Sequence, residues 1–106
     1  MNNRHEYLAT TPFDLYELSL FHLVVKHRSF TQAAAVAGLT QSAITRQMQG
    51  LESSLGLNLL ERTTRSVRAT AAGQDLYLAS RQILGEVEMT LQRQPGANSC
   101  AGVVSA

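Results

Sequence analysis

The segment from residue 40 to residue 56 most constrains the fold, because it reads as an amphipathic helix with well-defined ends. At about 100° per residue, its apolar side chains fall in one narrow sector that must face a core. These are Ile44, Met48, Leu51 and Leu55. The opposite sector contains no acid and no bulky apolar side chain; it carries Ser42, Thr45, Arg46, Gln49 and Ser53. With Thr40 as N-cap and Gly56 as stop, the pattern predicts a helix with a polar outer surface.

A second, shorter helix is expected immediately before this one, from Gln32 to Ala37. Thr31 is its expected N-cap and Gly38 its expected stop. Its side chains are nearly all alanine, which lets a neighbouring backbone approach closely. Because Thr40 follows Gly38 so soon, a tight turn must join the two helices, as in a helix-turn-helix unit.

One helix is expected before this pair and one hairpin after it. Asp14 can open the first helix, which ends near His27 and places Leu18, Phe21 and Val25 on one face. Residues 57–62 and 66–69 form two short extended stretches joined by a short basic connector. This arrangement is typical of a two-stranded hairpin.

A long final helix is expected from Thr70, as its cap, to about Gln92, roughly 33 Å at 1.5 Å per residue. Its apolar stripe is longer than a domain of this size needs for its own core, so part of it should bury against another chain. The expected interface residues are Leu76, Ala79, Ile83, Val87 and Leu91.

These elements together predict a mainly α fold, a winged helix-turn-helix with a three-helix core and a two-stranded wing, followed by a long linker or dimerisation helix. The expected divisions are a flexible N-terminal arm (1–13), the winged domain (14–69), the linker helix (70–92) and a disordered tail (93–106).

Charge distribution says more about a partner than net charge, which is only +1. Between residues 28 and 70, five arginines stand against two glutamates, whereas both flanks are slightly acidic. Eight of the nine basic residues are arginine, whose fork suits guanine edges and phosphates better than lysine does. Charge alone favours a solvated surface over a nucleic-acid partner.

An exposed helix of this kind has about the width that the DNA major groove admits. Arg46 can bridge two acceptors on guanine, and Gln41 or Gln49 can pair with adenine. The expected base-reading residues are Gln41, Ser42, Thr45, Arg46 and Gln49. Helix N-termini and wing side chains would instead hold phosphates, and here the candidates are Thr31, Thr40, Arg62, Thr64, Arg65 and Arg68.

Structural roles compete with several of these assignments. Thr31 and Thr40 could serve only as helix caps, and Arg46 could be merely solvated. Arg62 could form a structural ion pair with Glu61 or Glu52. These alternatives stay open at the level of the sequence.

Little in the chain indicates an enzyme, a cofactor or a metal site. His5, His22 and His27 are not spaced as metal ligands, and Cys100 lies far away in a tail of small residues. Neither a nucleophile elbow nor a phosphate-cradling glycine loop is present. His22 is expected at the edge of the first helix's packed face. With no long apolar run, we expect no membrane segment and a cytoplasmic location.

Across residues 14–92 the chain resembles the N-terminal DNA-binding domain of the LysR-type transcriptional regulators. The resemblance is carried by residues 29–34 (SFTQAA), 40–47 (TQSAITRQ), Leu51-Glu52 with Leu55-Gly56, residues 60–65 (LERTTR) with Val67, and residues 70–73 (TAAG).

The resemblance implies a homodimer formed by antiparallel packing of the long fourth helices, which spaces two recognition helices for an imperfect inverted repeat in double-stranded DNA. It implies that Gln41, Ser42, Thr45 and Arg46 face the major groove and that Arg65 approaches the backbone or the minor groove. Family members normally continue into regions that bind a small-molecule effector, so we expect no effector site in this chain.

The expected function is therefore sequence-specific DNA binding and regulation of transcription by a dimer. The alternative is a protein-interaction module that heterodimerises with a full-length regulator through its fourth helix. The two share a fold and differ in whether Arg46 or only the fourth-helix stripe is needed for activity.

Overall fold

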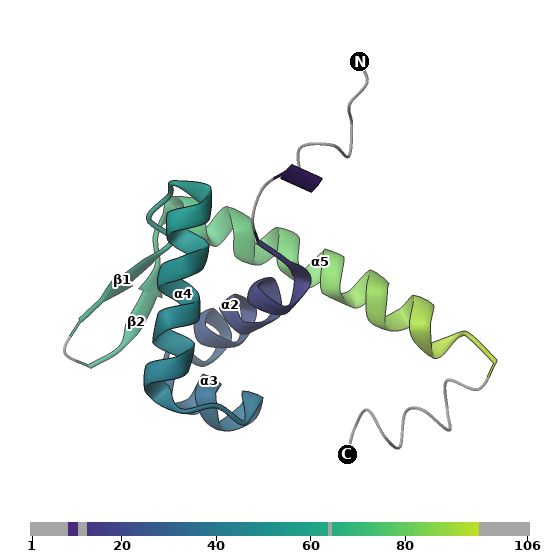
Figure 1. Ribbon diagram of the computed structural model, residues 1–106, viewed down its shortest axis with the longest axis horizontal. Coiled ribbons are helices and arrows are strands. Elements are labelled where there is room, and N and C mark those ends of the chain that lie inside the picture. The colour runs from purple at the N-terminus through teal and green to yellow at the C-terminus, as the bar shows by residue number, and fades with distance from the viewer. Residues whose placement is uncertain (1–8, 11–12, 64, 96–106) are drawn as a thin grey trace.

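A computed structural model describes residues 9–10, 13–63 and 65–95. Three helices, α2 (Leu15–His27), α3 (Phe30–Ala37) and α4 (Gln41–Leu55), are followed by strands β1 (Leu60–Arg62) and β2 (Val67–Ala69) and by the long helix α5 (Ala71–Gln92) (Figure 1). This order confirms the predicted winged helix-turn-helix fold with a long terminal helix. Residues 9–10 have helical backbone; the rest of the expected arm, apart from Phe13, and residues 96–106 of the expected tail lie outside the described residues.

The ends of the helices follow the local signals in the sequence. Asp14 forms a capping box with Glu17: its carboxylate accepts from the Glu17 amide at 2.9 Å, and the Glu17 carboxylate accepts from the Asp14 amide at 3.3 Å. Thr40 caps α4 by accepting from the Ala43 amide at 3.1 Å. Gly38 and Gly56 end α3 and α4 in left-handed conformations with φ of 72° and 67°, which glycine adopts without a Cβ clash.

The predicted cap of α3 is wrong by two residues. Ser29, not Thr31, is the N-cap, and its hydroxyl accepts from the Gln32 amide at 3.0 Å. The helix therefore begins at Phe30, whose ring is buried. Thr31 lies inside the first turn, where its hydroxyl donates to the Gln41 side-chain oxygen at 3.2 Å. Thr31 thus connects the two helices of the helix-turn-helix unit.

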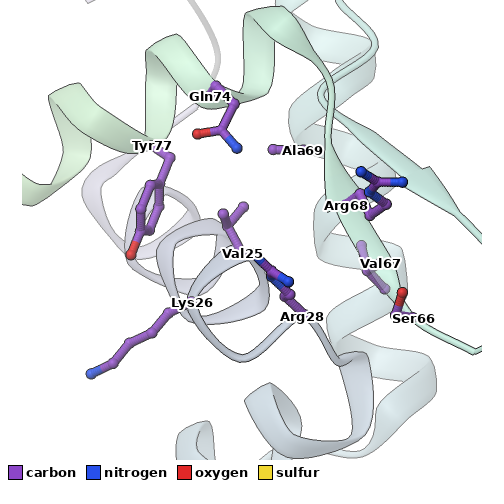
Figure 2. A pocket seen from close by; sticks show the side chains of 9 residues that line it. All are labelled: Val25, Lys26, Arg28, Ser66, Val67, Arg68, Ala69, Gln74 and Tyr77. Carbon is purple, nitrogen blue, oxygen red and sulfur yellow. The ribbon is translucent and has the colours of Figure 1, made fainter.

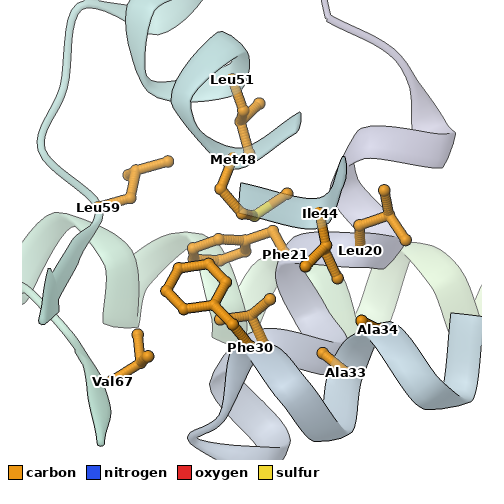
Figure 3. Close-up of a cluster of buried hydrophobic side chains, with 11 residues drawn as sticks. Leu20, Phe21, Phe30, Ala33, Ala34, Ile44, Met48, Leu51, Leu59 and Val67 are labelled. Atoms are coloured by element: carbon orange, nitrogen blue, oxygen red, sulfur yellow. The ribbon is translucent and has the colours of Figure 1, made fainter. Parts of the chain in front are cut away.

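The core lies where α2, α3 and α4 meet the base of the wing (Figure 3). As predicted, α4 buries Ile44, Met48 and Leu51, while Leu55 packs at the edge. The second half of α2 and the start of α3 supply most of the rest. The buried cluster comprises Leu20, Phe21, Val24, Phe30, Ala33, Ala34, Ile44, Met48, Leu51, Leu59 and Val67.

The wing is a shorter antiparallel hairpin than predicted, pairing Leu60 with Ala69 and Arg62 with Val67. Residues 57–59 are not in the strand, because the Glu52 carboxylate forms hydrogen bonds with the backbone where the strand begins. It accepts from the amides of Leu59 and Leu60 at 2.8 and 3.0 Å. Glu52 therefore positions the wing on α4 through charge-assisted hydrogen bonds.

The base of the wing is tightly joined to the start of α5. Thr70 accepts from the Gly73 amide at 3.1 Å as the N-cap and donates to the Asn58 carbonyl at 2.6 Å. The Thr70 amide donates to the Leu59 carbonyl at 3.0 Å. Gly73 is buried against Leu59, where a Cβ would collide with that carbonyl group. Glycine is thus required for α5 to approach the wing.

Farther along, α5 crosses α2 at a small polar cluster. His22 is stacked on Tyr77, with ring centroids 4.9 Å apart, and its Nδ1 lies 3.0 Å from the buried Ser80 hydroxyl. Because that hydroxyl donates to the Tyr77 carbonyl, it accepts from Nδ1–H of His22. Burial, followed by repulsion from Lys26 and Arg81, lowers the pKa of His22, against a raising effect of Glu88. Beyond this crossing, α5 extends away from the three-helix core (Figure 1).

Candidate nucleic-acid interface

The predicted base-reading residues share one surface of α4. The five side chains border a single open depression along the helix: Gln41, Ser42, Thr45, Arg46 and Gln49. Four are exposed and Thr45 is partly buried. Arg46 and Gln49 make no side-chain hydrogen bond or ion pair with any residue that the structure describes. Their donors are therefore available to an external partner.

The first turn of α4 is ordered by a chain of hydroxyl contacts. Thr40 lies 3.3 Å from the Ser42 hydroxyl and also caps the helix. The contact from Thr31 to Gln41 uses the side-chain oxygen of Gln41, which leaves its two N–H donors unused by that contact. The start of α4 is therefore pre-organised while still presenting donors.

The turn of the wing is closed by Thr63, which the sequence did not single out. Its hydroxyl accepts from the amides of Arg65 and Ser66 at 3.2 and 2.9 Å and donates to the Ser66 carbonyl at 3.0 Å. This is the local hydroxyl-to-backbone pattern that stabilises tight turns. It holds Arg65 at the exposed tip. Thr64 lies outside the described residues.

Arg62 has a structural contact, but not the ion pair considered as an alternative role. Its guanidinium carbon lies 4.5 Å from the centroid of the Phe30 ring, a cation–π geometry. Glu52, one of the two partners in that alternative, is committed to backbone amides instead. Arg62 nevertheless remains exposed, so the contact orients its guanidinium without removing it from solvent.

The wing turn and the helix-turn-helix unit face a common depression, here called the wing hollow. It is bordered by both helix starts and by both basic side chains of the turn: Thr31, Gln41, Arg62 and Arg65 are among its residues. Eight of the described DNA-binding candidates, counting those on the α4 depression, are thereby joined through Gln41 into one continuous surface.

Arg68 points to the other face of the wing. In the hairpin register, Arg62 pairs with Val67, so these two side chains share one face of the wing. Arg68 pairs with Glu61, and their side chains lie on the opposite face. It borders a second depression, between β2 and the start of α5. The structure therefore separates Arg68 from Arg62 and Arg65. Arg28, which was not among the candidates, borders both depressions.

The expected dimer residues on α5 occupy two environments. Leu76 packs against the core. Ile83 and Leu91 are 43% and 60% exposed, and Ala79 and Val87 are exposed and half-buried, respectively. Leu78 and Met89, which the sequence stripe omitted, are each 56% exposed on the same helix. Most of the exposed apolar side chains of α5, though not Leu78, therefore lie beyond its contact with the core.

Within the described residues, no group of histidine, cysteine, aspartate and glutamate side chains could hold a metal ion. None of the described helices is both long and apolar enough to cross a membrane.

Comparison with solved structures identifies close structural matches. The DNA-binding domain of BenM, in a complex with catB site 1 DNA, matches with a TM-score of 0.73 and 36% identity, covering 76% of this chain and 89% of that one. The DNA-binding domain of CbnR, also in a complex with DNA, matches with a TM-score of 0.69 and 34% identity, covering 86% and 99% of the two chains.

Sequence comparison leads to the same group of proteins. The HTH-type transcriptional regulator YfeR of Shigella flexneri is 40% identical over 80 residues, which are 76% of this chain and 26% of the relative. The chain thus spans about a quarter of the length of the curated relatives it matches. Residues 15–74 match the profile described as bacterial regulatory helix-turn-helix protein, lysR family. With more than half of its length in that match and with the same winged fold, the chain belongs to the LysR family of bacterial regulatory helix-turn-helix proteins.

Proposed function

We propose that the chain binds double-stranded DNA in a sequence-dependent manner and regulates transcription as a homodimer. The observation that carries this proposal is the outer face of α4, where the side chains of Arg46 and Gln49 have no polar partner among the described residues and Gln41 joins their surface to that of the exposed wing arginines. The complexes of the BenM and CbnR DNA-binding domains with DNA support it, because both share this fold.

In the proposed complex, α4 enters the major groove. Arg46 donates two hydrogen bonds to a guanine, Gln41 or Gln49 pairs with an adenine, and Ser42 and Thr45 allow the backbone to approach. Each good bidentate contact contributes about 1–3 kcal/mol of discrimination between bases. These residues therefore determine which sequence is bound.

Arg62 and Arg65 are proposed to contact phosphates from the border of the wing hollow. Arg62, oriented by Phe30, and Arg65, at the wing tip, are both exposed and cationic. Thr31, Thr40, Thr64 and Arg68 are the further proposed contacts. Such contacts position the protein on the duplex and provide affinity that depends on salt.

The proposed dimer forms through α5. Exposed apolar side chains along this helix, including Ile83 and Leu91, would be removed from water by a second copy. Two copies related by a two-fold axis present two α4 helices, which suits an imperfect inverted repeat. The proposed interface comprises Leu76, Ala79, Ile83, Val87 and Leu91.

The test for DNA reading is fluorescence anisotropy at several salt concentrations, with duplex pools that contain inverted repeats or scrambled sequences. Wild-type protein should prefer the repeats and lose affinity steeply as salt rises. Arg46→Ala should abolish the preference while retaining most of the salt dependence. Arg81→Ala, which removes an exposed arginine from α5 outside these surfaces, is the matched control. A folded wild-type protein that binds neither pool at low salt would refute the proposal.

The test for the dimer is sedimentation analysis of wild type, Ile83→Asp and Leu57→Asp. Leu57 is 48% exposed but lies just after α4, so it is a matched apolar control outside α5. Ile83→Asp should shift the population to monomer and weaken binding to the inverted repeats, whereas Leu57→Asp should not. Equal self-association of all three would contradict the α5 interface.

A further inference from the structure

Arg28 ends α2 in a backbone conformation that disfavours an arginine. Its φ of 53° and ψ of 36° are left-handed, and it is the one non-glycine residue with positive φ in the part of the chain that the structure describes. The other two left-handed helix ends are Gly38 and Gly56. A glycine at position 28 would end α2 without a Cβ clash. Arg28 therefore carries a backbone strain that glycine would not.

The guanidinium of Arg28 makes no hydrogen bond or ion pair with any residue that the structure describes. The backbone carbonyl of Arg28 accepts from the Val67 amide at 3.3 Å. The backbone of Arg28 thus ties β2 to α2. Its side chain keeps five N–H donors for an external group.

The guanidinium borders a hollow of about 600 Å³ between the end of α2, β2 and the first turns of α5, here called the β2–α5 hollow (Figure 2). Two more cations, Lys26 and Arg68, border it, and no carboxylate does. Ser66, Gln74 and Tyr77 add neutral polar groups. In Figure 2, the Gln74 amide points from α5 towards the base of the hollow, whereas Lys26 points outward.

The positive charge of this hollow favours the binding of an anion. Its three cations repel one another, and no carboxylate is among the residues that line it; Glu61 lies opposite Arg68 in the hairpin register. Arginine guanidinium groups together with neutral donors can form hydrogen bonds to the several oxygens of a phosphate, and they suit it better than a small anion with a single charge. The hollow is also continuous with the wing hollow, because Arg28, Ser66 and Val67 border both.

We propose that the β2–α5 hollow binds phosphate groups, with Arg28 as its principal ligand, and that in the DNA complex these are backbone phosphates flanking the wing. This inference rests on the proposed DNA binding and extends it beyond the surface of α4. It assigns a role to Arg28 and places Arg68 with Arg28 rather than with the wing tip.

The test compares wild type with Arg28→Gly, which removes the guanidinium and also relieves the left-handed strain. On a duplex extended by about one helical turn, about 10 base pairs, beyond each wing, the salt slope should fall by about 0.9 for each Arg28, about 1.8 for the dimer. Affinity of the dimer at about 0.1 M salt should fall about 60-fold, as that slope implies. On a duplex trimmed at the wing, the two proteins should bind equally. Thermal unfolding of Arg28→Gly at or above the wild-type midpoint excludes misfolding.

Two controls isolate the guanidinium. Arg28→Lys keeps the charge in the same strained conformation and should retain most of the salt slope. Arg81→Ala removes a charge from α5 outside the hollow and should behave as wild type.

Inorganic pyrophosphate distinguishes a free phosphate ligand from DNA. If it raises the unfolding midpoint of wild type but not of Arg28→Gly, while the salt slope of DNA binding is the same for both, the hollow binds phosphate but not that of DNA. If Arg28→Gly alters neither the slope nor the pyrophosphate response, the inference is overturned. Loss of sequence preference in Arg46→Ala in the same assay would leave the proposed function standing.

Discussion

Replacement of Gly73 by alanine should destabilise the fold by about 3 kcal/mol, because α5 and the wing touch at this residue. A Cβ there would overlap the carbonyl oxygen of Leu59 and lie 3.0 Å from the carbonyl carbon and 3.2 Å from the Ala69 Cβ. Leu59 cannot retreat, because its side chain is 0% exposed and its amide is bound to Glu52. The start of α5 must therefore move outward.

The magnitude combines three terms. Overpacking a methyl group against a fixed backbone costs about 3 kcal/mol. Separation of α5 from the wing also sacrifices the hydrogen bond from the Thr70 amide to the Leu59 carbonyl, about 1 kcal/mol. Alanine in place of glycine within the helix returns about 1 kcal/mol. The net loss of about 3 kcal/mol should lower the unfolding midpoint by about 12–24 °C for a domain of this size.

Thermal unfolding followed by circular dichroism, at one protein concentration, measures this loss. Gly50→Ala is the matched control, because a Cβ on Gly50 would lie 3.8 Å from the Glu17 carboxylate, an ordinary contact. That variant should gain about 0.5–1 kcal/mol from helix propensity. If Gly73→Ala unfolds at the wild-type midpoint or above it, the argued rigidity of the junction is refuted.

Three further stability predictions use urea unfolding. Glu52→Ala should cost about 2–3 kcal/mol by leaving the Leu59 and Leu60 amides without their charged acceptor, and Glu52→Gln should cost less; equal losses would contradict the role of the charge. Asp14→Ala should cost about 1 kcal/mol through loss of the capping box, and an unchanged midpoint would argue against that cap. The pKa of His22 is lowered on folding, so the unfolded state binds its proton more readily than the folded state does. The free energy of unfolding should therefore be unaffected by His22 above about pH 6.5 and should decrease as pH falls below that value. His22→Gln should remove this decline, and an identical pH profile would assign it to other groups.

Much of the fold was predictable because its elements begin and end at local signals. The hydroxyl of Thr40 and the glycines at positions 38 and 56 act within one helical turn, so their neighbours in sequence determine the outcome. The apolar period of α4 likewise fixes which side is buried, and the polar candidates consequently share the opposite side.

The errors arose where two local signals compete or where a distant group intervenes. Ser29 and Thr31 can both cap a helix. Gln32, three residues after Ser29, matches the capping-box spacing and favours Ser29 as the N-cap. The late start of β1 depends on the Glu52 carboxylate, which comes from another element. No pattern of alternating apolar residues could reveal it.

The separation of Arg68 from the other wing arginines could have been predicted from the periodicity of a strand. Arg68 is next to the buried Val67, so the two side chains must lie on opposite faces of the hairpin. By contrast, the contact of Arg62 with the Phe30 ring joins residues far apart in the chain and depends on the packed fold.

The junction at Gly73 also makes α5 a rigid arm attached to the wing. Thr70 fixes the first turn of α5 to Asn58 and Leu59, so helix and hairpin must rotate together. At 1.5 Å per residue the arm is about 33 Å long, and a rotation of about 5° at its base moves the far end by about 3 Å. Small angular changes at the junction are therefore amplified along α5. In the proposed dimer, such leverage would make the separation of the two α4 helices sensitive to any force applied at the far end of α5.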